Sequence, residues 1–261
     1  MPKLAANLSM MFNEVGFLDR FGVAANAGFK GVEYLFPYDF PAEAIGEQLD
    51  KHNLQQVLFD FPAGDFASGE RGIAIQPERQ GEFQDGVGKA LEYAKALQCR
   101  RLTVLAGLAP STTPPADLQA TLVENLKFAA EQASPHGINV LLEPLNTVDT
   151  PGFFLFRTSH ALSLIEAAGS PANLKLQYDV YHMQIMEGDL LRTIDANLGS
   201  IGHFQIADNP GRHEPGTGEI NYDNVLRHLD KAGYSGWVGC EYRPAENTVK
   251  GLVWASSYLG K

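Results

Sequence analysis

The stretch NVLLEPLN (residues 139–146) decides the fold: it is an apolar run that stops abruptly at an acidic residue, Glu143. The stretch LKLQYDVYH (174–182) likewise leads into an acid, Asp179. Runs such as NVLL (139–142) and LTVL (102–105) are read as continuously apolar rather than alternating, which is typical of parallel strands that are covered on both faces. These stretches therefore predict buried parallel strands with acids at their carboxyl ends.

Short apolar runs of this kind alternate along the whole chain with longer stretches of helical spacing. The predicted strands are 4–8, 31–35, 55–59, 101–105, 139–142, 174–178, 201–206 and 236–240. The predicted helices are 14–28, 41–52, 78–97, 117–135, 158–168, 186–197, 222–232 and 246–256. Eight strand–helix units in 261 residues predict an α/β fold, a (β/α)8 TIM barrel that forms one domain over residues 1–261. The alternative is a doubly wound open sheet, which the lack of a glycine-rich phosphate loop after the first strand disfavours.

The composition excludes several classes of protein. Twenty basic against thirty-one acidic residues give a net charge of −11, so the chain lacks the basic footprint that nucleic acids and anionic membranes require. Cys99 and Cys240 form neither a CxxC pair nor a disulfide framework, which favours a reducing compartment. The first residues lack the apolar core of a signal peptide, and no apolar run has the roughly 18 residues of a membrane helix. We therefore expect a cytoplasmic protein without nucleic-acid or membrane partners.

Acidic residues at strand ends predict a metal site, because a TIM barrel carries its chemistry at the carboxyl ends of its strands. Glu143, Asp179 and Glu241 each follow an apolar run, and Gln205 lies on the strand 201–206. Buried, converging carboxylates lose hydration and raise one another's pKa values, which a divalent cation relieves. The oxygen-rich, thiolate-poor set suits Mg²⁺ or Mn²⁺. A single strand-end acid is more often a salt-bridge or helix-capping partner than a metal ligand, so the prediction depends on three acids and Gln205 occurring together.

Seven segments make the chain resemble the hydroxypyruvate isomerase family, whose members are xylose-isomerase-like barrels close to the 2-oxo-tetronate isomerases. The resemblance implies a TIM barrel, interconversion of hydroxypyruvate and tartronate semialdehyde, and a place in glyoxylate metabolism. It also implies two catalytic glutamates, one accepting and one donating a proton; on this sequence they are Glu143 and Glu241. The segments are AANLSMMF (5–12), GVEYLFPYDF (31–40), PAGDFASGERGIA (62–74), LLEPLN (141–146), QYDVYHMQIMEGDL (177–190), HFQIADNPGRHEPGTGEINY (203–222) and GWVGCEYRP (236–244).

The resemblance also bears on the metal ligands. Related ketose epimerases have a Glu–Asp–His–Glu metal set, with the histidine in an HxH pair on the seventh strand. Here that pair reads His203-Phe-Gln205, so Gln205 takes the place of the second histidine. An amide oxygen is a weaker, neutral ligand, so the predicted set is Glu143, Asp179, Gln205 and Glu241 with a partial dependence on metal.

Three further positions match residues that contact substrate in the family: His182, Arg212 and Asp149. A small anionic hydroxy-keto acid entering an acidic protein needs a cation to receive its carboxylate. Arg212 is the first choice for that cation, and Arg71 and Arg243 are the alternatives. The sequence leaves the oligomeric state open, including a homo-oligomer.

The chemistry implied by the resemblance is an enediolate proton transfer between neighbouring carbons, which needs no redox cofactor. The rival activities are a 2-oxo-tetronate isomerase and then a ketose 3-epimerase. A metal-dependent endonuclease of the same superfamily would need a basic groove, which the net charge disfavours. A non-catalytic sugar-acid binding protein is the last alternative.

Overall fold

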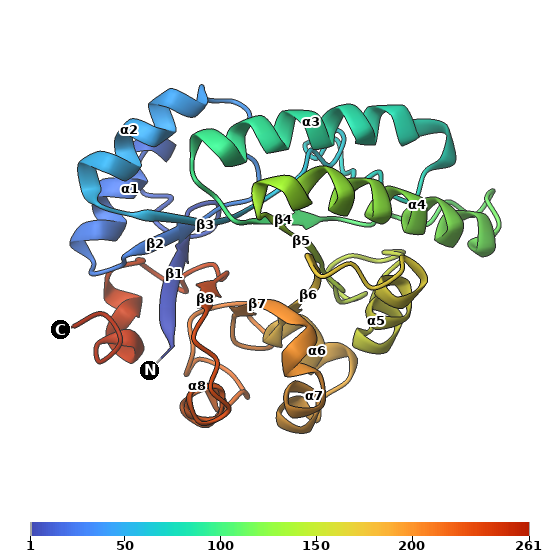
Figure 1. Ribbon diagram of the computed structural model, residues 1–261. Helices are drawn as coiled ribbons and strands as arrows, with labels where there is room; N and C mark the ends of the chain where they lie inside the picture. The colour runs from blue at the N-terminus through green and yellow to red at the C-terminus, as the bar shows by residue number, and fades with distance from the viewer. Residues whose placement is uncertain (1, 261) are drawn as a thin grey trace.

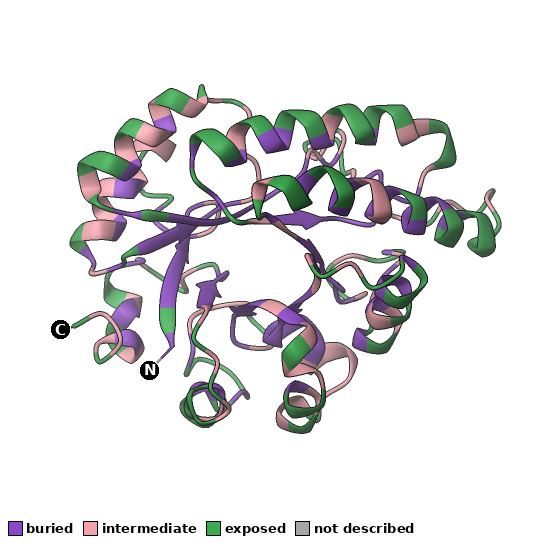
Figure 2. Ribbon diagram, viewed as in Figure 1, coloured by how far each residue is buried: buried purple, intermediate pink, exposed green. Residues whose placement is uncertain are grey.

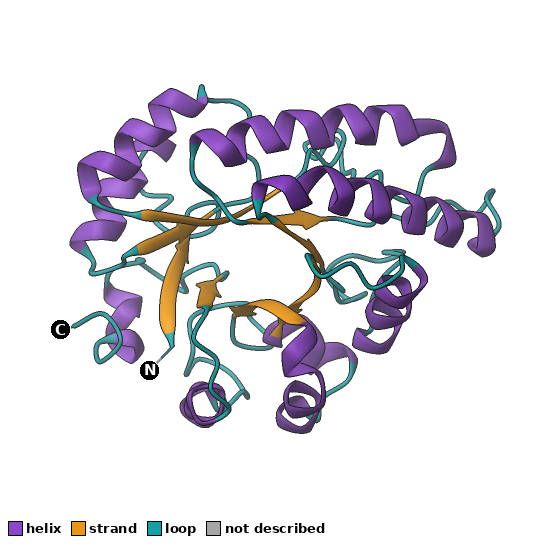
Figure 3. Cartoon of the chain, viewed as in Figure 1, coloured by secondary structure: helices purple, strands orange, loops and turns teal. Residues whose placement is uncertain are grey.

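Eight parallel strands close into a barrel in chain order within residues 2–260, which this computed structural model describes. Figure 3 shows the strands as an inner ring and the helices outside it. Each strand pairs with the next around the ring, with register shifts at Val32/Glu33 and Leu176/Gln177, and the closing pair joins Leu4 to Val238. The strands are β1 (Lys3–Asn7), β2 (Gly31–Glu33), β3 (Gln55–Asp60), β4 (Arg101–Val104), β5 (Asn139–Leu142), β6 (Leu174–Asp179), β7 (Ile201–Ile206) and β8 (Trp237–Cys240). The predicted TIM barrel is confirmed, and the open sheet is excluded.

The helices surround the barrel, and the N- and C-terminal ends of the chain lie on the same side of it (Figure 1). The α-helices are α1 (Phe17–Asn26), α2 (Ala42–His52), α3 (Gln80–Ala96), α4 (Pro115–Ala133), α5 (Thr158–Ala167), α6 (Val180–Met186), α7 (Leu190–Asn197) and α8 (Tyr222–Lys231). Short 3-10 helices are η1 (Pro77–Arg79), η2 (Ser134–His136), η3 (Leu198–Ser200) and η4 (Lys250–Ala255). The helix predicted at 246–256 was therefore wrong in type and length, since only η4 forms there. Among the described residues, no helix is both long and apolar enough to cross a bilayer.

The chain between β6 and β7 differs from the prediction of one helix at 186–197. Two helices form instead, α6 directly after β6 and then α7. The Asp179 carboxylate accepts a hydrogen bond from the Tyr181 backbone N–H at 2.8 Å, which caps the start of α6. Positive φ angles at Gly188 and Asp189, +65° and +46°, separate the two helices. The first turn of α6 therefore begins directly at the carboxyl end of β6.

The strands carry both apolar and polar buried side chains. Figure 2 shows the strands buried along most of their length, with exposure confined mainly to the outer faces of the helices. One apolar cluster contains Ala5, Val57, Leu58, Leu141 and Trp237. Buried polar side chains also lie on the strands: Asn7, Glu33, Thr103, Gln177, His203 and Gln205.

Candidate active site

The carboxyl ends of β5, β6 and β8 bring three acids to one place. Glu143 and Glu241 follow β5 and β8 directly, and Asp179 is the last residue of β6. One ligand atom from each of these acids, and one from His182 on α6, lie within 4.8 Å of one another. All four residues are buried, with exposed fractions of 5 % or less. Parallel strands in a closed ring end at the same rim, so residues about 100 positions apart meet there.

The electrostatics of this group are unfavourable without a counter-charge. Burial raises the pKa of Glu143 well above its usual value, and the Glu241 and Asp179 carboxylates raise it further. Burial likewise raises the pKa of Asp179 to about 6 and that of Glu241 to about 8, although Arg212 opposes both shifts. The three acids therefore compete with one another for protons near neutral pH.

The donor set fits a hard divalent cation. Glu143 Oε1 and Asp179 Oδ2 are buried and have no hydrogen-bond partner among the described residues. Unpaired buried oxygens are costly, and a cation coordinated by them removes that cost. The buried cluster could therefore hold a metal ion, with carboxylate oxygens as its principal ligands.

The predicted ligand Gln205 lies beside this cluster, and two hydrogen bonds fix its amide. Its Nε2 donates to Glu33 Oε1 at 2.9 Å, and its Oε1 accepts from Gln177 Nε2 at 2.6 Å. An amide oxygen has two acceptor sites, so one remains free for a cation. Gln205 as a metal ligand stays a prediction.

His182 contacts the cluster in a form that does not suit a metal ligand. Its Nδ1 accepts a hydrogen bond from the Asn146 backbone N–H at 3.1 Å, so the ring proton of neutral His182 is on Nε2. Burial keeps the imidazole neutral because it lowers the pKa of His182 well below its usual value, and Arg212 adds to this. The Nε2 atom faces Asp179 Oδ2 at 3.6 Å. The Nε2 atom of His182 thus lies between the Asp179 carboxylate and Arg212 Nη2, which is 3.5 Å away.

Arg212 lies over the mouth of the barrel and pairs with a predicted catalytic acid. Its Nη2 donates to Glu241 Oε2 at 2.7 Å, and the guanidinium is 5.2 Å from the centre of the Tyr181 ring. Burial lowers the pKa of Arg212, but Glu241 and Asp179 outweigh that effect and raise it. A backbone φ of +52°, uncommon for a residue other than glycine, accompanies this placement. Its buried Nε has no hydrogen-bond partner among the described residues.

Asp149 is held in the loop after β5 by two hydrogen bonds. Its Oδ2 accepts from Asn146 Nδ2 at 3.1 Å and from the Tyr181 hydroxyl at 2.7 Å. The same Asn146 donates its backbone N–H to His182. Asp149 thus lines the pocket and also connects two residues that position His182 and Arg212.

The sequence interpretation overlooked the acids of β2 and β3. Glu33 is fully buried and accepts hydrogen bonds from His203 Nε2 at 2.8 Å and from Gln205. Asn7 Nδ2 connects this group to the site, since it donates to Glu33 and to Glu241 Oε1 at 3.1 Å. Burial, together with Glu241 and Glu33, raises the pKa of Asp60 on β3 well above its usual value. Asp60 follows the apolar run Val57–Phe59, the same signal that identified the later strand ends, whereas Glu33 stands inside the run GVEYLF (31–36).

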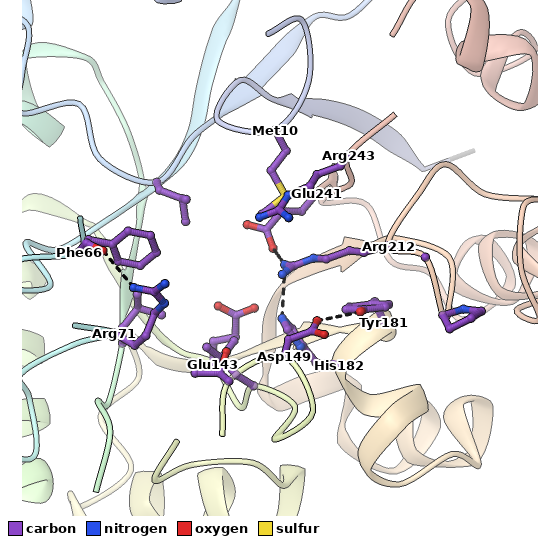
Figure 4. Close-up of a pocket in the computed structure, with 16 residues that line it drawn as sticks. Met10, Phe66, Arg71, Glu143, Asp149, Tyr181, His182, Arg212, Glu241 and Arg243 are labelled. Carbon is purple, nitrogen blue, oxygen red and sulfur yellow. Dashed lines mark hydrogen bonds and ion pairs between the residues drawn. The ribbon is translucent and has the colours of Figure 1, made fainter. Parts of the chain in front are cut away.

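One pocket of about 430 Å³ is lined by Glu143, Glu241, Asp149, His182 and Arg212, whereas the predicted ligands Asp179 and Gln205 are not among its lining residues (Figure 4). In Figure 4, Glu143 lies between Arg71 on one side and the group of Arg212, His182 and Glu241 on the other. The lining residues are Met10, Leu35, Phe66, Arg71, Leu105, Glu143, Leu145, Asp149, Thr150, Tyr181, His182, Pro210, Gly211, Arg212, Glu241 and Arg243. Paired acids and donors that face the same pocket suit proton transfer on a small polar molecule.

Comparisons with known proteins agree with this geometry. The chain is 48% identical over 261 residues to the 2-oxo-tetronate isomerase of Cupriavidus necator, covering 100% of both chains. It is 49% identical over 258 residues to the hydroxypyruvate isomerase of Escherichia coli strain K12, covering 99% of this chain and 100% of that one. A crystal structure from Brucella melitensis described as an AP endonuclease, family 2, superimposes with a TM-score of 0.97 at 50% identity, covering 99% of each chain. Residues 21–258 match the family model described as xylose isomerase-like TIM barrel. This chain therefore belongs to the xylose isomerase-like TIM barrel family.

Proposed function

We propose that this protein is an aldose–ketose isomerase that interconverts hydroxypyruvate and 2-hydroxy-3-oxopropanoate (tartronate semialdehyde). The observation that carries the proposal is the pair of buried carboxylates, Glu143 and Glu241, facing one pocket within 4.8 Å of each other. The two relatives at 48–49% identity are both named as isomerases, which supports this class of reaction.

The reaction moves one hydrogen from C3 of hydroxypyruvate to C2. One glutamate removes a proton from the C3 hydroxymethyl group, and the electron pair forms the C2–C3 double bond of an enediolate. The other glutamate delivers a proton to C2, and the hydroxyl proton on the C3 oxygen moves to the C2 oxygen, leaving an aldehyde at C3. Glu143 and Glu241 exchange these roles when the reaction runs in reverse.

The neighbouring side chains support these steps. His182 donates its Nε2–H to a substrate oxygen, because Asn146 holds its Nδ1 as an acceptor. Arg212 and Asn7 fix the two oxygens of Glu241, so this carboxylate keeps one orientation. Asp149 and Tyr181 form the wall of the pocket beside them.

We infer that a divalent cation, Mg²⁺ or Mn²⁺, is held by Glu143, Asp179, Gln205 and Glu241. When bound, such a cation would stabilise the negative charge that develops on the two vicinal oxygens of the substrate. The unpaired oxygens of Glu143 and Asp179 support this assignment. Cytoplasmic location, glyoxylate metabolism, the absence of nucleic-acid partners and the oligomeric state stay predictions.

The direct test measures formation of tartronate semialdehyde from hydroxypyruvate with and without added Mg²⁺ or Mn²⁺. Glu143→Gln and Glu241→Gln should each lower kcat by at least about 1000-fold while the protein stays folded. Glu166→Gln, a change on the exposed face of α5, is the matched control and should leave kcat unchanged. Absence of turnover under every metal condition would remove the hydroxypyruvate assignment, and an active double variant would remove the two-carboxylate mechanism.

The second candidate is a 2-oxo-tetronate isomerase, which the 48% identical relative favours. This substrate is one carbon longer and needs the same carbonyl shift, so Glu143 and Glu241 would act in the same way. Side-by-side kcat/KM values for the two keto acids decide between these activities. A ratio above about 10 in favour of the four-carbon acid would reassign the substrate.

A further inference from the structure

We propose that Arg71 binds the substrate carboxylate and makes the pocket selective for keto acids over neutral ketoses of the same length. The inference rests on the proposed isomerase function and names the group that recognises the acid. Arg71 lines the same pocket as Glu143 and Glu241 and reaches it from the loop between β3 and η1. In Figure 4 it lies on the opposite side of Glu143 from Arg212.

The backbone on both sides of Arg71 is fixed. On one side, the Glu70 carboxylate accepts the backbone N–H of Asp65 and pairs with Arg79. On the other side, Gly72 has a φ of +113° and packs so closely that a Cβ there would meet the Leu105 carbonyl oxygen at 2.1 Å. These contacts fix the backbone position of Arg71, although the loop has no helix or strand at that residue.

The guanidinium of Arg71 is positioned without being neutralised. Its Nη1 donates to the backbone carbonyls of Glu70 at 2.7 Å and Phe66 at 3.1 Å, and it lies 4.1 Å from the centre of the Phe66 ring. The Phe66 ring packs in turn on Phe36, with centroids 5.0 Å apart. Among residues 2–260, no carboxylate forms an ion pair with Arg71, so its positive charge and its remaining N–H donors are available to a ligand.

The other two arginines of the pocket are less suited to this role. Arg212 already pairs with Glu241 at 2.7 Å, so most of its charge offsets a carboxylate of the protein. Arg243 is exposed, and no hydrogen bond or ring contact within the described residues fixes its guanidinium. A fixed, unpaired guanidinium is the better receptor for a carboxylate, since its planar fork makes two parallel hydrogen bonds and loses little freedom on binding.

The acidic surroundings of the pocket favour such a receptor. Glu143 and Glu241 line the pocket, and the chain has a net charge of −11, so an anionic substrate gains from a nearby positive charge. An acid bound with its carboxylate on Arg71 and its hydroxyl end toward His182 and Arg212 would place the carbons between them next to Glu143. A neutral ketose gains nothing from Arg71, so this residue sets the preference for an acid.

The test compares Arg71→Met and Arg71→Lys with the wild-type enzyme on two substrates. Hydroxypyruvate carries the carboxylate, whereas dihydroxyacetone has the same ketone and hydroxymethyl group without it. We expect Arg71→Met to lower kcat/KM for hydroxypyruvate by on the order of 100-fold, mainly through KM, and to change kcat/KM for dihydroxyacetone by less than about threefold. Arg71→Lys should fall between, at about 10-fold, because it keeps the charge but loses the fork.

Calorimetric measurement of pyruvate binding tests the contact between Arg71 and a carboxylate independently of catalysis. The affinity for pyruvate should be about 100-fold weaker in Arg71→Met than in the wild type. Arg192→Met, which removes an exposed arginine on α7, is the matched control and should bind pyruvate as the wild type does. Failure of the wild type to isomerise either acid would count against the proposed function, while the pyruvate measurement would still report on Arg71. The inference is overturned if Arg71→Met binds pyruvate normally, if Arg243→Met shows the larger loss, or if activity on both substrates falls by the same factor.

Discussion

Acidifying the solution should weaken metal binding steeply, because protons and the cation compete for the same buried oxygens. Burial raises the pKa of Glu241 from an ordinary 4.5 to about 8, and that of Asp179 to about 6. A raised pKa means that the metal-free folded protein holds these protons near neutral pH, so a metal must displace them. Affinity is therefore greatest above about pH 8 and is lost as the pH falls below that value.

The size of the effect follows from the pKa of Glu241. Each pH unit below that pKa weakens metal binding by nearly tenfold for each proton that must leave, or about 1.4 kcal/mol. From about pH 7.5 to about pH 6, Glu241 alone should weaken Mn²⁺ binding on the order of 20-fold. Glu143, whose pKa is also raised by burial, should increase this factor.

Isothermal titration calorimetry of the chelator-treated protein with Mn²⁺ measures this dependence directly. Runs in buffers of different ionisation enthalpy also report the number of protons released, which should be one or more at about pH 7. Glu241→Gln, which has no proton to lose, should reduce the proton release by about one. If the wild-type Kd changes by less than about threefold over this pH range, the carboxylates are already ionised in the free protein and the electrostatic reasoning fails.

Three further outcomes are expected. Asn7→Ala should lower kcat about tenfold with little effect on KM, because Glu241 Oε1 loses the amide that orients it; unchanged kcat would contradict this. Gly72→Ala should destabilise the fold by about 2–3 kcal/mol and lower the Tm by roughly 5–10 °C, because its Cβ would collide with the Leu105 carbonyl; a Tm equal to that of the wild type would show that the loop relaxes freely. Removing metal with a chelator should lower kcat at least about tenfold, with recovery on adding Mn²⁺ back, and full activity in the metal-free protein would disprove a catalytic cation.

The barrel and the location of its acids follow from local sequence. Runs such as VLL (140–142) and GWVGC (236–240) have almost no polar residue, so they need cover on both faces, and eight strands alternating with helices leave few folds available. Because all strands of a parallel barrel end at one rim, Glu143, Asp179 and Glu241 could be expected to meet, and in the structure they do. The segment after Asp179 was misjudged because α6 has only 7 residues, too few to show a helical period.

The sequence by itself determined the architecture, since apolar periodicity and strand-end acids are properties of neighbouring residues. Only the tertiary structure determined which polar groups form hydrogen bonds and ion pairs with one another. It placed the Asn146 backbone N–H on Nδ1 of His182, the Asn7 amide on Glu241, and Arg212 rather than Arg71 on that same carboxylate. Hydrogen bonds and ion pairs act over about 3 Å, so they depend on how side chains from distant strands pack together. The spacing of residues along the chain does not predict the distances between those side chains.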